Sequence, residues 1–251
     1  MAEDLTNPVW RWMFDTRITP WGTRDYFNSG DCPNWTCSRF GQSKTVLPDQ
    51  TTIWIGGEHE DYYDPDFFIY NDVIVKQPDG TVRFLGYGEQ EFPPTDFHTA
   101  TLYDNGSKIL LIGNLGYSQD RKRGTTQVLS LDLSSYSIKT IECSGTGPGW
   151  VHKHKATAEP DGNGIVISSG IVDNGESLLE NIDQWRLDIA AWQWTQLTDR
   201  KWQQFAVHRE DKKPLNLFGY SCLEFDLKHR GLASVEDSDL AAKLGITSLP
   251  I

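Results

Sequence analysis

The segment EHEDYYDPDFFIYND (58–72) interleaves carboxylate side chains with aromatic rings. In a contact surface, acids steer a positively charged partner toward the protein, and rings that become buried supply the contact energy. The segment therefore predicts a docking surface for a basic protein. The alternative is a solvated loop whose rings fold back onto the body of the protein, because aromatic residues are core formers first.

A second polar segment, YSQDRKRGTT (117–126), carries three consecutive basic residues. These residues either add a positive patch to the surface or pair with its acids. Trp35, Trp150 and Trp202 each stand four residues before an expected first strand, which favours a packing role. Trp21 lies outside that pattern and is the freer candidate for binding. The predicted partner-binding residues are Glu58, Glu60, Asp61, Tyr62, Tyr63, Asp64, Asp66, Phe67, Phe68, Trp21, Arg121 and Arg123.

Patterns that support catalysis are weak. His152 and His154 alternate, so on one strand they would point to the same side, but nothing in the sequence supplies the further ligands of a metal. The EHED cluster has the residue types of a cation site or an acid/base pair, although such clusters are common in acidic loops without any chemistry. The sequence has no GxSxG, phosphate-loop or dinucleotide motif. We therefore expect no catalytic residue, no metal and no cofactor.

Composition limits the partners. The 251 residues contain 38% hydrophobic and 23% charged side chains, which is typical of a globular protein with a sizeable core. The formal net charge of −12 makes nucleic acid a poor partner and favours a basic protein. We expect a monomer.

The cellular compartment of the protein is predicted from the lack of membrane-spanning and secretory segments in the sequence. No window approaches 18 consecutive apolar residues, and MAEDLTNPVW has acids where a secretory signal has basic and then apolar residues. We therefore expect a cytoplasmic protein that does not bind membranes. The four cysteines form no CxxC pair, so reduced thiols are favoured, with a Cys32–Cys37 disulfide as the alternative in an oxidising compartment.

The elements that must position these segments form a repeat. Three apolar runs that end in small residues, TTIWIGG (51–57), KILLIGN (108–114) and GIVISSG (164–170), place Gly56, Gly113 and Ser169 at spacings of 57 and 56 residues. Arg39, His98 and His154 are expected to open the strand before each run. Two further strands follow each run, and we expect them within 71–77 and 81–85, 127–133 and 136–141, and 182–188 and 192–197. The sequence therefore predicts an all-β protein with three units of four antiparallel strands.

These units resemble the kelch repeat over roughly residues 35–200. The features shared are a His or Arg that opens the first strand, a Gly pair that closes the second, an apolar third strand that ends in Asp, and a Trp in the fourth. The resemblance implies a β-propeller with blades of four strands. It also implies protein binding through the face that carries the long connections.

A fourth blade is expected near the two ends of the chain. Residues 203–227 resemble the first three strands of a blade, and VWRWMFDTR (9–17) matches AWQWTQLTDR (191–200), so residues 9–14 are predicted to supply the missing fourth strand. Such a strand would close the ring and remove a free sheet edge. We expect a four-bladed kelch-like propeller over residues 1–229 and a tail over 230–251, with a short helix between Ser234 and Gly245. The alternative is a two-sheet sandwich with coincidental spacing.

Three functional hypotheses follow. The leading one is a protein-binding module that uses the acidic and aromatic long-loop face, such as an inhibitor or a bacterial immunity protein that blocks a basic toxin or enzyme. The second is an enzyme similar to the kelch-like sugar isomerases and oxidases, with a small-molecule pocket at the axis near Arg39, His98 and His154. The third is a scaffold whose helical tail mediates self-association.

Overall fold

The computed structural model describes residues 2–59 and 67–199. The chain divides into two units, of which the first comprises Met1–Gly175 and Leu179–Gln204 and the second comprises Glu176–Leu178 and Phe205–Ile251. The three sheets that contain the four-stranded meanders belong to the first unit. The predicted fourth-blade strands in 203–227 and the predicted helix between Ser234 and Gly245 lie outside the described residues.

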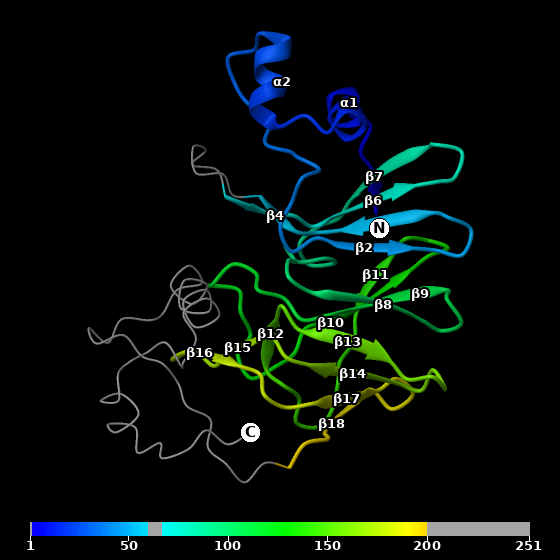
Figure 1. Cartoon of the computed structure of the whole chain (residues 1–251), viewed down its shortest axis with the longest axis vertical. Coiled ribbons are helices and arrows are strands. Elements are labelled where there is room, and N and C mark those ends of the chain that lie inside the picture. The colour runs from blue at the N-terminus through cyan, green and yellow to red at the C-terminus, as the bar shows by residue number, and fades with distance from the viewer. Residues whose placement is uncertain (1, 60–66, 200–251) are drawn as a thin grey trace, which may run out of the picture. The chain divides into compact units, whose positions relative to one another are not determined.

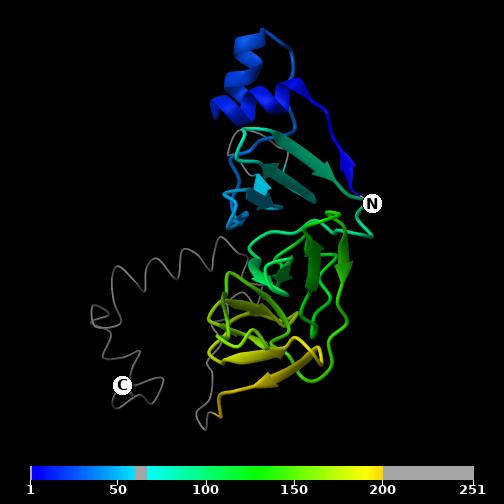
Figure 2. The same cartoon turned by 90° about the vertical axis from the view of Figure 1, so that its right-hand side faces the viewer.

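Three antiparallel sheets follow one another along the chain, and each contains a four-stranded meander (Figures 1 and 2). They confirm the three repeat units and the all-β class predicted from the sequence. The first sheet contains β2 (Ser43–Val46), β3 (Thr52–Ile55), β6 (Asp72–Lys76) and β7 (Val82–Gly86). The second contains β8 (Thr99–Tyr103), β9 (Lys108–Ile112), β10 (Val128–Asp132) and β11 (Ile138–Thr140). The third contains β13 (Lys155–Ala158), β14 (Gly164–Ser168), β17 (Trp185–Asp188) and β18 (Gln193–Gln196).

The middle strands are apolar on both sides because the second sheet is covered on both faces. In β9, Ile109 and Leu111 pack in a core cluster with the first sheet, while Leu110 and Ile112 pack in a cluster with the third. Successive side chains of a strand point to opposite faces, so the continuous run KILLI supplies both clusters. The first strands of the three sheets lie in a row, with β8 between β2 and β13.

Residues 9–14 form a helix, so the prediction of a closing strand there is wrong. Helix α1 (Pro8–Thr16) begins with Pro8 at its first turn and is capped by Asn7, whose side-chain oxygen accepts bonds of 3.0 and 3.2 Å from the backbone amides of Val9 and Trp10. Met13 and Phe14 are buried against the first sheet. Tertiary packing of this helical face decides the conformation against the alternating Trp pattern.

The rest of the N-terminal region also covers the first sheet. Strand β1 (Glu3–Asp4) pairs with β7 as a short fifth strand, and α2 (Pro20–Phe27) follows α1. Within residues 2–59 and 67–199, no helix has the length and apolar character needed to cross a membrane.

The packing of α1 can be tested with a cavity-forming variant. Phe14 is 3% exposed, and its ring makes edge contacts with Trp54 and Phe84. We expect Phe14→Ala to lower the free energy of unfolding by about 3–4 kcal/mol in urea titrations, because a buried ring is lost. Thr16→Ala, an exposed position on the same helix, is the control and should change the stability by less than about 1 kcal/mol. Equal effects of the two variants would contradict the helical packing.

Candidate interaction surface at the long connections

The long connections of all three sheets emerge at the same ends of the strands. In Figure 1 they lie on the left, whereas the short hairpin turns lie on the right. The connections that join second to third strands span residues 56–71, 113–127 and 169–184, and those that join one sheet to the next span 87–98 and 141–154. Each sheet thus contributes to one side of the molecule, as the up-and-down strand order requires.

Some of these connections contain short strands that the sequence reasoning missed. Strands β4 (Glu58–His59) and β5 (Phe68–Ile69) pair with each other at the base of the first connection. Strands β12 (Trp150–His152), β15 (Ile171–Asp173) and β16 (Leu178–Glu180) form a separate small sheet. The connections therefore have a hydrogen-bonded framework of their own.

A glycine at the end of the second strand allows the next connection to cross closely. Gly56 and Gly113 have φ angles of 55° and 79°, and a Cβ atom at either would collide with a carbonyl oxygen, that of Thr95 or of Val151. The residue after each glycine donates its backbone amide to the same carbonyl, Gly57 to Thr95 at 2.8 Å and Asn114 to Val151 at 2.9 Å. Glycine adopts this conformation without strain and leaves space for the crossing chain.

His98 and His154 join neighbouring sheets. The Nε2 atom of His98 lies 2.8 Å from Oγ of Ser43 at the start of β2, and that of His154 lies 2.9 Å from Oγ1 of Thr99 at the start of β8. Both rings are buried, and burial lowers the pKa of His98 to about 3 and that of His154 to about 4. Both histidines are therefore neutral at physiological pH.

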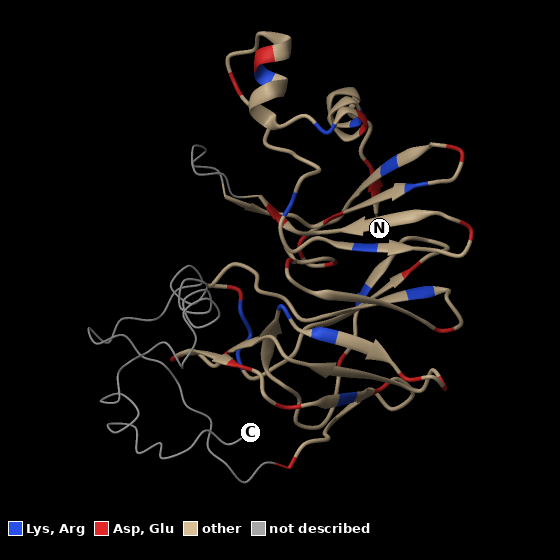
Figure 3. Ribbon diagram, in the orientation of Figure 1, with Lys and Arg blue, Asp and Glu red and all other residues tan. Residues whose placement is uncertain are grey.

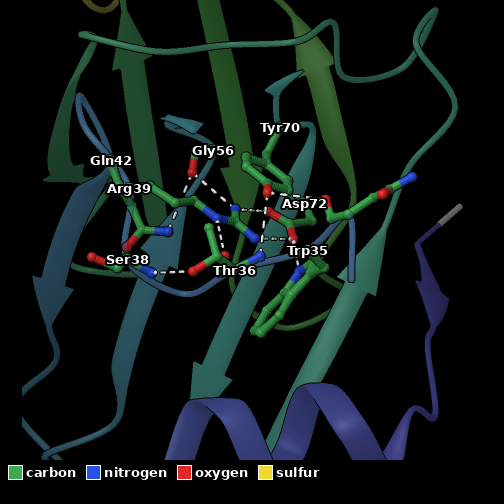
Figure 4. Close-up of polar contacts among 9 residues, drawn as sticks. Trp35, Thr36, Ser38, Arg39, Gln42, Gly56, Tyr70 and Asp72 are labelled. Carbon is green, nitrogen blue, oxygen red and sulfur yellow. Dashed lines mark hydrogen bonds and ion pairs between the residues drawn. The ribbon is translucent and has the colours of Figure 1, made fainter. Parts of the chain in front are cut away.

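Arg39 does not open a first strand, which corrects the sequence alignment. Strand β2 begins at Ser43, so Gln42 holds the position that corresponds to His98 and His154. The fully buried guanidinium of Arg39 binds Asp72, with an Nη2–Oδ2 distance of 2.8 Å, and lies 3.4 Å from the ring centroid of Tyr70 (Figure 4). Trp35 donates its indole N–H to the same carboxylate at 3.1 Å.

Arg39, His98 and His154, the residues of the enzyme hypothesis, have structural roles in this arrangement. Arg39 binds within the first sheet and its preceding connection, while His98 and His154 bind hydroxyl groups of adjacent sheets. The enzyme hypothesis required these side chains to face a pocket at the axis. In all three residues the contacts described lie within a sheet or between neighbouring sheets, and the buried Nδ1 atoms of His98 and His154 have no hydrogen-bond partner within the described part of the chain.

His152 and His154 do not share a strand, so that interpretation is also wrong. Strand β12 ends at His152, Lys153 has a φ of 54°, and β13 begins at Lys155. Burial, the main cause, lowers the pKa of His152 to about 3. Among the described residues there is no group of three side chains that could hold a metal ion.

The predicted contact residues are distributed unevenly. The range 60–66 lies outside the described residues, and it holds Glu60, Asp61, Tyr62, Tyr63, Asp64 and Asp66. Glu58 was predicted to lie on the exposed surface, but it is only 6% exposed, so that prediction is wrong. Phe67 and Phe68 are 42% and 36% exposed at the start of β5.

Tyr117 ties the first connection to the second. Its hydroxyl accepts the backbone amide of Ile69 at 2.9 Å, and its ring meets that of Phe67 edge to face with centroids 5.8 Å apart. The acidic, aromatic connection and the basic one therefore meet, as expected from their equivalent positions in the repeat.

The basic residues tie the second connection to the third. Arg121 and Arg123 both bind Asp173, with N–O distances of 2.9 and 3.2 Å. Burial opposes ionisation of Asp173, but bonds from these two arginines and from the amide of Gly175 outweigh burial and lower its pKa. The side chain of Arg121 is only 16% exposed, so a contact role suits Arg123, at 44%, better than Arg121.

A buried acid pair lies beneath these connections, and no signal in the sequence marked it. Asp96 is fully buried, its Oδ1 accepts the amide of Gly116 at 2.7 Å, and the Glu58 side chain lies within hydrogen-bonding reach. Burial raises the pKa of Asp96. The hydrogen bonds from the amide of Gly116 and with the Glu58 side chain act against this rise.

Trp21 lies apart from the other predicted contact residues. It belongs to α2, beyond the first sheet in Figure 1, and is half-buried. The guanidinium of Arg24 lies 4.3 Å from its ring centroid. The structure therefore does not bring Trp21 to the long connections.

Comparisons with known proteins identify no family. No protein-family model matches the chain, and no curated protein matches it. Among solved structures, the chain is similar to that of YjhT, with a TM-score of 0.48 and 14% sequence identity. The similarity covers 71% of this chain and 55% of that chain, so the chain spans little more than half the length of that structure.

The buried histidines predict a loss of stability in acid. An unfolded histidine titrates near pH 6.5, whereas His98 and His154 resist protonation until about pH 3 and pH 4, so the unfolded chain takes up protons first as the pH falls. We expect each histidine to remove about 2 kcal/mol of stability between pH 7 and pH 5. Urea titrations at both pH values measure this.

The variant His98→Gln isolates the contribution of His98 to this loss of stability. Glutamine is a suitable replacement because Gln42 already occupies the corresponding position in the first sheet. The pH-dependent loss should be smaller than in the unmodified protein by about 2 kcal/mol. An unchanged difference between pH 7 and pH 5 would show that His98 is not buried in its neutral form.

Proposed function

We propose that the chain is a protein-binding module, built as a kelch-like β-propeller, whose long connections form the contact surface for a basic protein. The observation that carries the proposal is that these connections are bonded to one another through Tyr117, Arg121 and Arg123. A surface that is ordered before binding loses less conformational entropy on association than separate mobile loops do.

The exposed side chains of this surface fit the proposal. Phe67 and Phe68, which directly follow the acidic segment 60–66 in the sequence, supply exposed rings, and exposed aromatic side chains are frequent anchors of protein interfaces. The net charge of −12 gives long-range attraction to a basic partner. Figure 3 shows acids on both the connection side and the hairpin-turn side, so the rings rather than charge alone distinguish the proposed surface.

The propeller part of the proposal rests on the repeat of the sheets. Three four-stranded meanders pack face to face with their first strands in a row, which is the arrangement of successive propeller blades. The strand-like segments in 203–227 would provide the fourth blade. Since residues 9–14 are helical, this blade would have to obtain its outermost strand elsewhere. An inhibitor or immunity protein of a basic toxin or enzyme remains the specific role that we propose for such a module.

Partner capture followed by quantitative binding tests the proposal. The full chain is used as bait in lysate of the source cell, the captured protein is identified and purified, and its affinity for the full chain is measured by biolayer interferometry. We expect Phe67→Ala combined with Phe68→Ala to weaken binding about tenfold or more, mainly through faster dissociation, because the anchoring rings are lost.

Charge is tested with two matched triple variants, each of which removes three acids. Asp61, Asp64 and Asp66 are changed to Asn in one, and Asp49, Asp79 and Asp161 of the hairpin turns in the other. Asn keeps the turn-forming acceptor of the second set. We expect only the first variant to slow association and to reduce its salt dependence. Equal effects of the two sets, or no effect of the Phe substitutions, would exclude this surface as the contact site.

A further inference from the structure

A separate cavity lies between the N-terminal helical region and the first sheet. Its volume is about 900 Å³, within the range of small-molecule sites. One wall comes from the start of α1 and from residues 27–35, and the other from the start of β6 and the end of β7. None of the predicted partner-binding residues lines it, so the cavity is distinct from the proposed contact surface.

Aromatic rings form much of the lining. Trp10 and Trp35 stack with centroids 5.1 Å apart and an interplanar angle of 12°, and Tyr70 and Tyr87 also line the cavity. Trp35 is only 3% exposed, and Tyr87 is tied down by a 2.7 Å hydrogen bond from its hydroxyl to the carbonyl of Tyr136. These rings are therefore held in place before any ligand arrives.

The charges of the lining are all negative. Glu3, Asp31 and Asp72 line the cavity, and no Lys, Arg or His does. Asp72 is neutralised by Arg39, whereas Glu3 and Asp31 are exposed and form no ion pair within the described part of the chain. The lining of the cavity thus contains two carboxylates without an ion-pair partner in the described part of the chain, together with several aromatic rings.

One cation of the protein itself, Arg39, already lies against two rings of the lining. Its guanidinium lies 3.4 Å from the centroid of Tyr70 and 5.3 Å from that of Trp35, both of which line the cavity. Aromatic faces attract cations through their quadrupole, and nearby carboxylates add to this attraction. From the cavity, its rings and its unpaired acids, we infer that it binds a small organic ammonium ion with an apolar body.

Ligand-observed proton NMR with the full chain tests this inference. Choline chloride serves as the cation, and 3,3-dimethylbutan-1-ol, which has the same shape without the charge, serves as the neutral control. We expect the trimethylammonium signal to move upfield through ring currents and choline to bind with a dissociation constant of about 1 mM or lower, while the neutral alcohol binds at least about tenfold more weakly.

Three variants assign the site. Glu3→Gln and Asp31→Asn should each weaken choline binding about three- to tenfold, because each removes an exposed carboxylate of the lining. Asp4→Asn is the matched control, since Asp4 adjoins Glu3 in β1 but binds Arg83 and does not line the cavity. Its affinity should change by less than about twofold.

Two results would overturn the inference. One is equal affinity for choline and the neutral alcohol, or no choline binding below about 10 mM, a concentration at which non-specific association dominates. The other is equal weakening by Asp4→Asn and Asp31→Asn, which would show that net charge alone controls binding. Both outcomes leave the proposed protein-binding surface unaffected, because that surface involves other residues.

Discussion

The packing of successive sheets depends on a close crossing of two chain segments. The connection that leads from one sheet to the next passes directly over the end of the second strand of the earlier sheet. At Gly56 and Gly113 the crossing carbonyl occupies the space of a side chain, and the next residue binds that same carbonyl. One carbonyl thus accepts a hydrogen bond that joins two successive sheets. The distance between the sheets at this end is fixed by backbone atoms rather than by the size of a side chain.

The polar contacts beside these crossings follow from them. His98 and His154 each reach the first strand of the preceding sheet because the crossing brings the two first strands together. The same geometry gathers the long connections at one end, where Tyr117 and Asp173 join them. The order of the proposed contact surface is therefore a consequence of how the sheets are spaced.

The sequence predicted the sheets well because their strands obey simple rules. The runs at Gly56, Gly113 and Ser169 placed β3, β9 and β14, and the strands that follow each of them lie where they were expected. The sequence comparison aligned Arg39, rather than Gln42, with His98 and His154. The segment before β2 differs in length and in residues from the segments before β8 and β13, so it gave no guide to the correct alignment. The Glu58–Asp96 pair was missed because burial created by distant segments has no local signal.

The N-terminal prediction failed because an alternating Trp pattern is compatible with more than one structure. Trp10 and Trp12 suggested a strand, but Asn7 and Pro8 are strong signals for the start of a helix. Closure of the ring by residues 9–14 would also be needed only if an uncovered sheet edge had to be paired by the opposite end of the chain. The structure protects such edges locally, because β1 pairs with β7 at the outer edge of the first sheet.

The third sheet is also protected at its edge by a nearby segment of the chain. Beside its outer strand β18, the amide of Ser144 donates to the carbonyl of Trp192 at 2.8 Å, and the carbonyl of Ser144 accepts the amide of Trp194 at 2.9 Å. Gly145 has a φ of 78°, and a side chain there would collide with the carbonyl of Trp194. A connection from the preceding sheet therefore covers the start of this edge, which shortens the stretch open to edge-to-edge association without any strand from the N-terminus.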